Sequence, residues 1–324
     1  MKEIIIKFLD IATIKFIGNE KLIEVVKKYY TGLESDNDEV DYILKLNEKV
    51  LPDQMNIPEE AIFKRCFAGP HYYSWEKDGY KYAYSPKKER GGSHLIMQKN
   101  NFFQITFHQG ESPLQIVGIS REILEKKALS QGYMPIHAAV VSKDDKGYVF
   151  FGDRNKGKST SMFSSIIFDG AKPMSSDIAM VKEERGGWKV IGWPFTVTID
   201  QSYFNLIDRV PVRNISNNGK IKYYPEDFCE EFNTQWIWEQ HLDSMIHVDI
   251  DPNSKASMRE VSSDELKKRL ELYGKDSGWK WNDVFGLGNF EPSFNYERIS
   301  KMVNGKILTG DIIQFFKHRE DIER

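Results

Sequence analysis

Residues 150–160 read FFGDRNKGKST, and this short stretch decides which kind of fold the chain adopts. Gly152 to Ser159 fits the pattern G-x-x-x-x-G-K-[ST] without a gap. In such a loop the second glycine lets the backbone approach a polyphosphate, where a Cβ atom would collide. The lysine contacts the β- and γ-phosphates, and consecutive backbone N–H groups form a nest for an anion. The pattern requires a strand before the loop and a helix after it, whose N-terminal dipole favours the anion.

The flanking residues predict both of these elements. The run GYVFF, residues 147–151, is typical of a buried strand, and STSMFSSIIF, residues 159–168, has apolar residues at helical spacing. From average residue usage, a chance match in a chain of this length is on the order of 1%. We therefore predict that the loop binds a nucleotide. The alternative is a surface turn that merely matches the pattern.

We expect residues of the loop and of the first turn of the following helix to contact the nucleotide. Ser159 can offer its hydroxyl to Mg²⁺. Asn155 stands where a left-handed backbone conformation can be needed, which asparagine tolerates. Arg154 and Lys156 either add charge toward the phosphates or an acceptor, or are solvated loop charges. The predicted binding residues are Gly152, Asp153, Arg154, Asn155, Lys156, Gly157, Lys158, Ser159 and Thr160.

Two residues outside the loop are candidates for chemistry. Asp177, in SSDIAMV at residues 175–181, stands beside a predicted strand. An acidic residue at a strand end near such a loop is a common second ligand for Mg²⁺, because hard cations prefer oxygen. His137 begins the strand-like run HAAVV, fifteen positions before Gly152. A lone histidine is more often a core residue than a catalyst, so spacing alone does not assign it.

The unit HAAVVSKDDKGYVFFGDRNKGKSTSMFSSIIFDGAKPMSSDIAMV, residues 137–181, resembles the catalytic core of HPr kinase/phosphorylase and related bacterial serine kinases. These proteins are similar in fold to phosphoenolpyruvate carboxykinases. The resemblance covers about residues 130–250, where GWPFTVTID looks like a further strand region. It implies catalytic roles for His137, Lys158 and Asp177, and a metal bound by Ser159 and Asp177.

Two positions depart from the family pattern. The family loop reads G-x-S-G-x-G-K-S, whereas this chain has Arg154-Asn155. The first of the two aspartates that end the following strand, which is implicated in acid–base work, is Ser176 here. A serine cannot act as a base at neutral pH. Either the base is supplied elsewhere, or transfer proceeds by positioning and charge neutralisation, or the protein only binds.

The resemblance and the residue patterns together predict an α/β protein in three parts. Residues 131–260 form a P-loop core like that of HPr kinase and phosphoenolpyruvate carboxykinase, with a mixed, strongly bent sheet. Residues 1–130 form an N-terminal α+β domain that helps to frame the acceptor. Residues 261–324 form a helical C-terminal extension that packs on the core.

Composition limits the class of protein. The net charge of −3 provides no general basic field for nucleic acid or anionic membranes. No apolar run reaches the length of a membrane-spanning helix, and no signal peptide is visible, so we expect a cytoplasmic protein. The two cysteines, Cys66 and Cys229, form no metal-binding pattern and are expected to be buried free thiols.

These features predict an ATP- and Mg²⁺-dependent kinase that transfers the γ-phosphate to a hydroxyl group. The expected partners are the nucleotide and a peptide or protein with an acceptor serine, and a homo-oligomer is compatible with the sequence. The alternative is a catalytically weakened, nucleotide-binding regulatory protein. Carboxykinase chemistry is disfavoured because the chain is short and lacks a cluster of basic residues for oxaloacetate.

Aromatic segments at residues 72–84 and 279–290 could anchor a peptide acceptor, or could pack in the core. Lys220 and Lys222 could approach an acidic acceptor or phosphate, although a solvated hairpin is the simpler interpretation.

Overall fold

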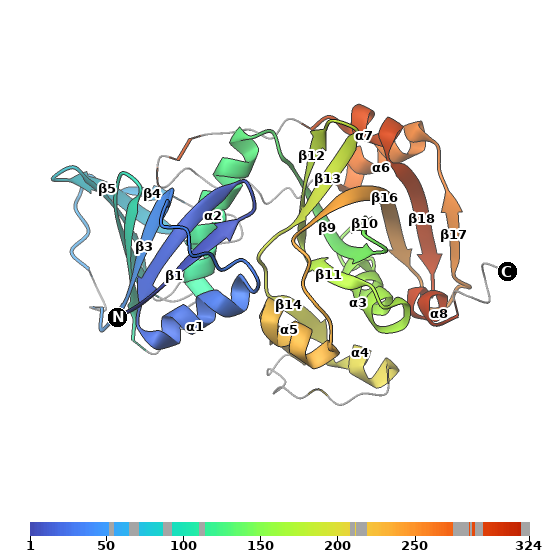
Figure 1. Ribbon diagram of the computed structural model, residues 1–324, viewed down its shortest axis with the longest axis horizontal. Coiled ribbons are helices and arrows are strands. Elements are labelled where there is room, and N and C mark those ends of the chain that lie inside the picture. The colour runs from blue at the N-terminus through green and yellow to red at the C-terminus, as the bar shows by residue number, and fades with distance from the viewer. Residues whose placement is uncertain are drawn as a thin grey trace. The chain divides into compact units, whose positions relative to one another are not determined.

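The chain is a mixed α/β protein, as predicted (Figure 1). The computed structural model describes residues 1–51, 55–64, 71–86, 93–109, 114–207, 211, 219–274, 285, 287–288 and 294–318. The chain divides into two units. The first is Met1–Gln131 together with Ser277–Glu291, and the second is Gly132–Asp276 together with Pro292–Arg324.

The first unit is a mixed sheet with two helices, α1 (Glu20–Tyr29) and α2 (Leu114–Ser130). Its strands are β1 (Lys2–Phe8), β2 (Ala12–Gly18), β3 (Tyr42–Lys49), β4 (Ile62–Lys64), β5 (Tyr72–Lys77), β6 (Tyr80–Ser85), β7 (His94–Lys99) and β8 (Phe102–His108). They lie in the order β1-β2-β3-β8-β7-β6-β5-β4. The pairs β2–β3 and β3–β8 are parallel, and the other neighbours are antiparallel.

The α1 helix forms where apolar residues recur at helical spacing. The side chain of Asn19 caps it by accepting a hydrogen bond from Leu22 N–H at 2.9 Å, which satisfies an otherwise unpaired donor. Lys27 and Lys28 occupy its last turn, where positive charge complements the helix dipole. The buried face packs against β1 and β2 and consists of Leu22, Ile23, Val26 and Tyr29.

The aromatic residues that were candidates for acceptor anchors lie in this unit. Phe285 is buried, and its ring contacts Tyr72 and Phe103 at centroid distances of 6.4 and 5.7 Å. At Phe285, the core-packing alternative is therefore correct. Residues 279–284, 286 and 289–290 lie outside the described residues. On β5 and β6, Trp75 and Tyr82 stack at 5.3 Å and remain partly exposed, so an anchoring role there stays a prediction.

The second unit contains the loop of residues 152–157. Its main strands are β9 (Met134–Lys143), β10 (Lys146–Phe151), β11 (Lys172–Ser175), β12 (Ile178–Glu184), β13 (Gly187–Gly192), β16 (Glu239–Ile250), β17 (Ser257–Glu260) and β18 (Asn304–Gly310). A small separate hairpin consists of β14 (Val197–Asp200) and β15 (Lys220–Tyr223). The helices are α3 (Lys158–Asp169), α4 (Gln201–Leu206), α5 (Pro225–Phe232), α6 (Ser263–Tyr273), α7 (Tyr296–Met302) and α8 (Ile312–Lys317).

The sheet of the second unit is mixed, and its pairings close on themselves. The strand order is β10-β9-β12-β13-β16-β18-β17, and β10 also pairs with β16 in parallel. The chain of neighbours from β10 through β9, β12 and β13 therefore returns through β16 to β10. A sheet can close in this way only if it is strongly curved. The predicted mixed, bent sheet agrees with these pairings.

Alternate residues of the strands face one hydrophobic core. On β9 these are Met134, Ile136, Ala138 and Val140, and on β10 they are Val149 and Phe151. Because side chains alternate between the two faces of a strand, the odd-numbered residues of β9, including His137, face the other way. Leu266 and Leu270 of α6 and Ile299 of α7 cover the core. On the other side, α3 packs against β9, β10, β11 and α8 (Figure 1).

The C-terminal region requires a correction, because it is not only helical. Residues 304–310 form β18, which pairs in parallel with β16 and antiparallel with β17. A short apolar run between two helices has no local signal for a parallel partner, which lies far away in sequence. Within the region predicted to be helical, residues 263–273 form α6, and the hydroxyl of Ser262 caps it by accepting a hydrogen bond from Glu265 N–H. The predicted division into three domains stays a prediction.

Three smaller expectations concern single side chains and the membrane. Cys229 is a free, half-buried thiol whose pKa is raised by burial to about 12, while Cys66 lies outside the described residues. Lys220 and Lys222 are exposed on β15, which favours the solvated hairpin. Among the described helices, none is long and apolar enough to cross a membrane.

His247 is a titratable group buried in the second unit. It lies on β16, 5% exposed, with its ring 5.5 Å from that of Phe151 and 4.9 Å from that of Tyr273. Arg269 donates a hydrogen bond to His247 Nδ1 at 3.1 Å. Burial and the positive charge of Arg269 lower the pKa of His247 to about 4. The imidazole is therefore neutral in the folded protein near neutral pH.

This burial predicts a loss of stability in acid. Between pH ~6.5 and pH ~4 the unfolded chain binds a proton at His247 that the folded chain does not, so the free energy of unfolding falls as the pH falls. We expect a contribution on the order of 2–3 kcal/mol across this range. The measurement is urea unfolding at pH 7 and pH 4.5. His247→Gln should remove this part of the pH dependence, whereas His241→Gln, at an exposed position of the same strand, should retain it. Equal pH slopes for His247→Gln and the unsubstituted protein would contradict the assignment.

Candidate functional site

The phosphate-loop candidate joins the end of β10 to the start of α3. The strand ends at Phe151, and the helix begins at Lys158. The predicted strand and helix on the two sides of the loop are therefore present. Phe151 pairs with Ala138 on β9 and with His247 on β16, so a neighbouring strand supports the start of the loop on either side.

The conformation of the loop explains its two glycines. Gly157, at φ 100°, caps α3 in a left-handed conformation. A Cβ atom there would lie 2.9 Å from Ile312 Cδ1 and 3.1 Å from Ile250 Cβ. At Gly152, a Cβ atom would lie 2.6 Å from the carbonyl oxygen of Val248. Asn155 has φ 61°, so the predicted left-handed conformation is confirmed.

Lys158 is buried at the start of the helix. Its Nζ donates to the carbonyl oxygen of Gly152 at 3.0 Å and to that of Asp153 at 2.9 Å. Only 8% of the residue is exposed, although lysine is seldom buried without partners. These contacts keep the ammonium group folded back onto the loop.

Both the backbone and the side chain of Lys156 bond to residues of β16. Its carbonyl oxygen accepts a hydrogen bond from Ile250 N–H at 3.1 Å, and its Nζ lies 2.8 Å from Asp249 Oδ1. The hydrogen bond with Asp249 raises the pKa of Lys156. Arg154 is exposed, and its backbone N–H donates to Asp153 Oδ1 at 2.7 Å. Lys156 is thus a paired charge and Arg154 an exposed loop residue, and contacts of either residue with phosphates or an acceptor stay a prediction.

His137 and Asp177 lie together beside the loop. His137 Nε2 is 3.3 Å from Asp177 Oδ1, and the side chains are 21% and 44% exposed. The backbone fixes the pair, since Ala138 N–H donates to the carbonyl of Asp177 at 3.0 Å and His137 pairs with Ile178 in the sheet. The N–H of His137 also donates to Gly274 at the end of α6, at 3.2 Å.

Ser176 does not join this pair in the structure. Its hydroxyl donates to the carbonyl oxygen of Thr196 at 3.4 Å. Its neighbour Ser175 is buried and bonds to the backbone of Ile178. The position occupied by an aspartate in the family that the sequence resembles therefore makes a backbone contact here.

The two strands beside β10 carry polar groups to opposite sides of the loop. β9 runs antiparallel to β10, and Ala138 of β9 pairs with Phe151, the last residue of β10. His137, which precedes Ala138, therefore lies beyond the end of β10. β16 runs parallel to β10, and its residue His247 pairs with Phe151. Asp249, two residues after His247, therefore also lies beyond the end of β10. With neighbouring strands about 4.8 Å apart, the two side chains belong to strands separated by about 10 Å across the loop.

Asp249 is a residue that sequence reasoning did not single out. It stands in MIHVDID, residues 245–251, where a carboxylate follows a run of mostly buried residues. That signal resembles the one used for Asp177, a polar residue at a strand end. The missing information was that β16 pairs with β10, because this pairing joins residues about a hundred positions apart.

The metal-binding prediction depends on the donor groups near the loop. Among the described residues, no group of three or more His, Cys, Asp or Glu side chains is arranged to hold a metal ion. Mg²⁺ commonly uses one or two protein oxygens and completes its shell with phosphate oxygens and water. The Ser159 hydroxyl and the second carboxylate oxygen of Asp177 are groups of the right chemistry for such an ion, and magnesium binding by them stays a prediction.

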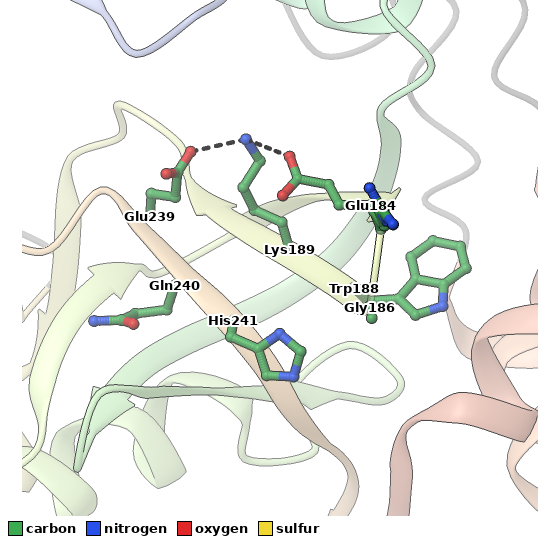
Figure 2. Close-up of a pocket in the computed structure, with 9 residues that line it drawn as sticks. Glu184, Gly186, Trp188, Lys189, Glu239, Gln240 and His241 are labelled. Atoms are coloured by element: carbon green, nitrogen blue, oxygen red, sulfur yellow. Dashed lines mark ion pairs between the residues drawn. The ribbon is translucent and has the colours of Figure 1, made fainter.

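Two polar pockets lie at opposite ends of β16. One, of about 530 Å³, adjoins the loop and is lined by Lys156, Asp249–Ile250, the turn that follows and the end of β18. The other, of about 310 Å³, is lined by the end of β12, the start of β13 and the start of β16 (Figure 2). In the second pocket Lys189 lies 2.8 Å from Glu184 and 3.0 Å from Glu239. The two carboxylates neutralise this cation, and none of the predicted site residues lines that pocket.

No protein-family model matches the chain, and no curated protein matches it. Among solved structures, the chain is similar to the HPr(Ser) kinase/phosphatase from Coxiella burnetii, with 12% sequence identity and a TM-score of 0.28 over 59% of this chain and 99% of that one. This likeness is too weak to support a conclusion about the site. The family resemblance and the roles of the site residues therefore stay predictions.

The fit of the loop against its neighbours can be tested with the glycines at the two ends of α3. Gly157 and Gly170 both have positive φ values, but Gly170 has no atom within 4 Å of the Cβ position. Gly170→Ala should cost about 1–2 kcal/mol of unfolding free energy for its left-handed conformation. Gly157→Ala should lose roughly 1–3 kcal/mol more, because the new methyl group meets Ile250 and Ile312. Urea unfolding measures both, and equal losses would show that the loop is not packed against these residues.

Proposed function

We propose that this protein is an ATP-dependent kinase that transfers the γ-phosphate to a hydroxyl group, with a serine of a peptide or protein as acceptor. The observation that carries the proposal is the placement of a His–Asp pair beside a glycine-containing loop that leads into a helix. Loop and pair occupy the same end of the same sheet. The loop supplies anion binding, and the pair supplies a group that can move a proton.

The loop has the parts that a polyphosphate requires. Residues 153–156 are exposed, and their backbone N–H groups are close to the N-terminus of α3. A helix N-terminus and a nest of N–H groups both favour an anion. Lys158, which now bonds to loop carbonyl oxygens, can exchange these partners for phosphate oxygens, which bind an ammonium more strongly because they are charged.

The His–Asp pair can act on the acceptor hydroxyl. With Asp177 accepting from Nε2–H, the other ring nitrogen of His137 can accept the hydroxyl proton as the acceptor oxygen attacks the γ-phosphorus. A bond forms between the acceptor oxygen and phosphorus, the bond to the β–γ bridging oxygen breaks, and ADP leaves. Asp177 stabilises the imidazolium that results. This arrangement needs no aspartate at position 176.

Magnesium is the metal that this chemistry implies. Ser159 and Asp177 are the residues that would hold it. When bound, it would neutralise charge on the phosphate oxygens. The exposed fraction of Asp177, 44%, and its two carboxylate oxygens allow the residue to contact both His137 and a cation.

A nucleotide-binding regulatory protein is the second candidate. The observation in its favour is Ser176, whose hydroxyl is engaged by the Thr196 backbone instead of acting in the site. Such a protein would be stabilised by ATP without transferring or hydrolysing its phosphate. Thermal stabilisation by ATP, together with no turnover across a panel of serine peptides, would favour it over the kinase.

Lys158 provides the first test of the kinase proposal. Lys158→Ala should lower phosphate transfer from γ-labelled ATP by at least ~100-fold, because the developing charge loses its main protein cation. Lys172→Ala, which removes an exposed lysine of the same unit, should keep normal transfer. The readout is label on the acceptor peptide, with circular dichroism to verify folding. Normal transfer by Lys158→Ala would overturn the proposal.

A substitution of His137 distinguishes a role in proton transfer from a role in nucleotide binding. His137→Asn should reduce kcat by ~10²–10⁴-fold, as expected when a general base is lost, while the Kd for ATP changes little. His241→Asn, at an exposed histidine at the other end of the sheet, should behave like the unsubstituted protein. Single-turnover transfer and calorimetric binding of ATP measure the two quantities. A loss of affinity with unchanged kcat would assign His137 to binding instead.

A further inference from the structure

The pocket beside the loop has a defined wall. It is lined by Lys156 of the loop, Asp249 and Ile250 at the end of β16, Asp251 and Pro252 of the next turn, and the end of β18. Its volume of about 530 Å³ is within the range of small-molecule sites, which run from about 300 to 1,000 Å³. The loop forms one side of this pocket, so a ligand in the pocket can continue into the loop.

Backbone hydrogen bonds hold this wall in place. Ile250 N–H donates to the carbonyl of Lys156 at 3.1 Å, which joins the loop to the wall. Asp251 N–H donates to the carbonyl of Gly310 at 3.0 Å, and Asp311 N–H donates to that of Ser254 at 3.0 Å. The side chain of Asp251 accepts from Asn253 N–H at 3.1 Å and from the Ser254 hydroxyl within the turn. The pocket is therefore formed before any ligand enters.

The direction of phosphate transfer decides which group belongs in it. In an in-line displacement, the attacking oxygen and the leaving oxygen lie on opposite sides of the phosphorus. The His137–Asp177 pair lies beside β10 on the β9 side, and the pocket lies on the β16 side. If the acceptor approaches from the pair, the leaving ADP must extend away from it, toward β16.

We infer that the pocket between the loop and β18 binds the nucleoside of the nucleotide, with the ribose hydroxyls at Asp249 and the base against Ile250 and Pro252. This inference rests on the proposed function, since it assigns the remainder of the ligand whose phosphates occupy the loop. It also gives Asp249 a role as a specificity residue that does not take part in proton transfer.

The chemistry of Asp249 suits a pair of neighbouring hydroxyl groups. A carboxylate accepts hydrogen bonds at both oxygens and donates none, so it matches the two O–H donors of a ribose. Lys156 contacts Oδ1 at 2.8 Å, which fixes the carboxylate. Oδ2 and the second lone pair of Oδ1 can then accept from the two hydroxyls. The same lysine offsets one negative charge between the pocket and the phosphates. A phosphate in the pocket itself would instead meet both Asp249 and Asp251.

The test compares three probes in the presence of Mg²⁺: ATP, 2′,3′-dideoxy-ATP and inorganic tripolyphosphate. The unsubstituted protein should bind ATP about 10- to 100-fold more tightly than the dideoxy analogue, the range for lost hydrogen bonds to a charged group. In Asp249→Asn the ratio of the two Kd values should fall to about 3 or less. The reason is that the neutral amide has one acceptor oxygen, whereas the carboxylate has two charged ones. Tripolyphosphate, which has no nucleoside, should bind the variant at least as tightly as the unsubstituted protein. Isothermal titration calorimetry gives each Kd.

Asp243→Asn is a matched control. Asp243 lies on the same strand and pairs with Lys146 at 3.1 Å, as Asp249 pairs with Lys156, but at the other end of β10 and β16. This control should retain the full ratio between ATP and the dideoxy analogue.

The outcomes separate this inference from the proposed function. Equal binding of ATP and dideoxy-ATP by the unsubstituted protein, with tripolyphosphate still bound, overturns the nucleoside assignment alone. A full ratio retained in folded Asp249→Asn overturns it as well. Failure of all three probes to bind overturns the nucleoside assignment and the proposed function together. The comparison on the unsubstituted protein decides the matter even if the variant does not fold.

Discussion

The hydrogen bond from Ile250 N–H to the carbonyl of Lys156 is the contact on which the position of the loop depends. It joins a segment after β10 to the end of β16, and these two strands are already neighbours in the sheet. The loop therefore lies flat against β16, with Gly152 facing the backbone of Val248 and Gly157 facing Ile250. At these close approaches any larger residue would push the loop away from the strand. The glycine requirement of the motif thus follows from packing as well as from ligand access.

Contacts with neighbouring strands and with the loop backbone also explain the two lysines of the loop. Lys156 pairs with Asp249 across the loop, and Lys158 bonds to carbonyl oxygens at its start, so the two lysines have different neighbours. The pair Lys156–Asp249 is about half-exposed, and such pairs contribute little to stability because water screens them. Its effect is to orient the Asp249 carboxylate beside the loop. Nothing in the structure assigns a partner-specific role to Arg154.

Local patterns allowed a good part of this structure to be predicted. The strand, loop and helix around residues 152–157 follow from apolar spacing and glycine positions. The nearness of His137 to Asp177 came only from a family resemblance, because the two residues are joined by antiparallel pairing of β9 and β12. Asp249 and β18 could not be predicted, since both depend on parallel pairing with β16 between distant segments. Parallel pairing leaves no turn signal in the sequence.

The route of the chain has a consequence for how the protein can be made. Strands β9, β10, β12, β13 and β16 all precede Asp276, after which the chain supplies a segment to the first unit before it returns to form α7 and β18. On the ribosome, the loop, His137 and Asp177 therefore emerge well before the strand that covers the outer edge of β16. Until β18 arrives, residues 244–250 present an open strand edge, a form that readily pairs with other chains. A fragment that ended at residue 276 would contain the predicted catalytic residues but would carry that open edge permanently.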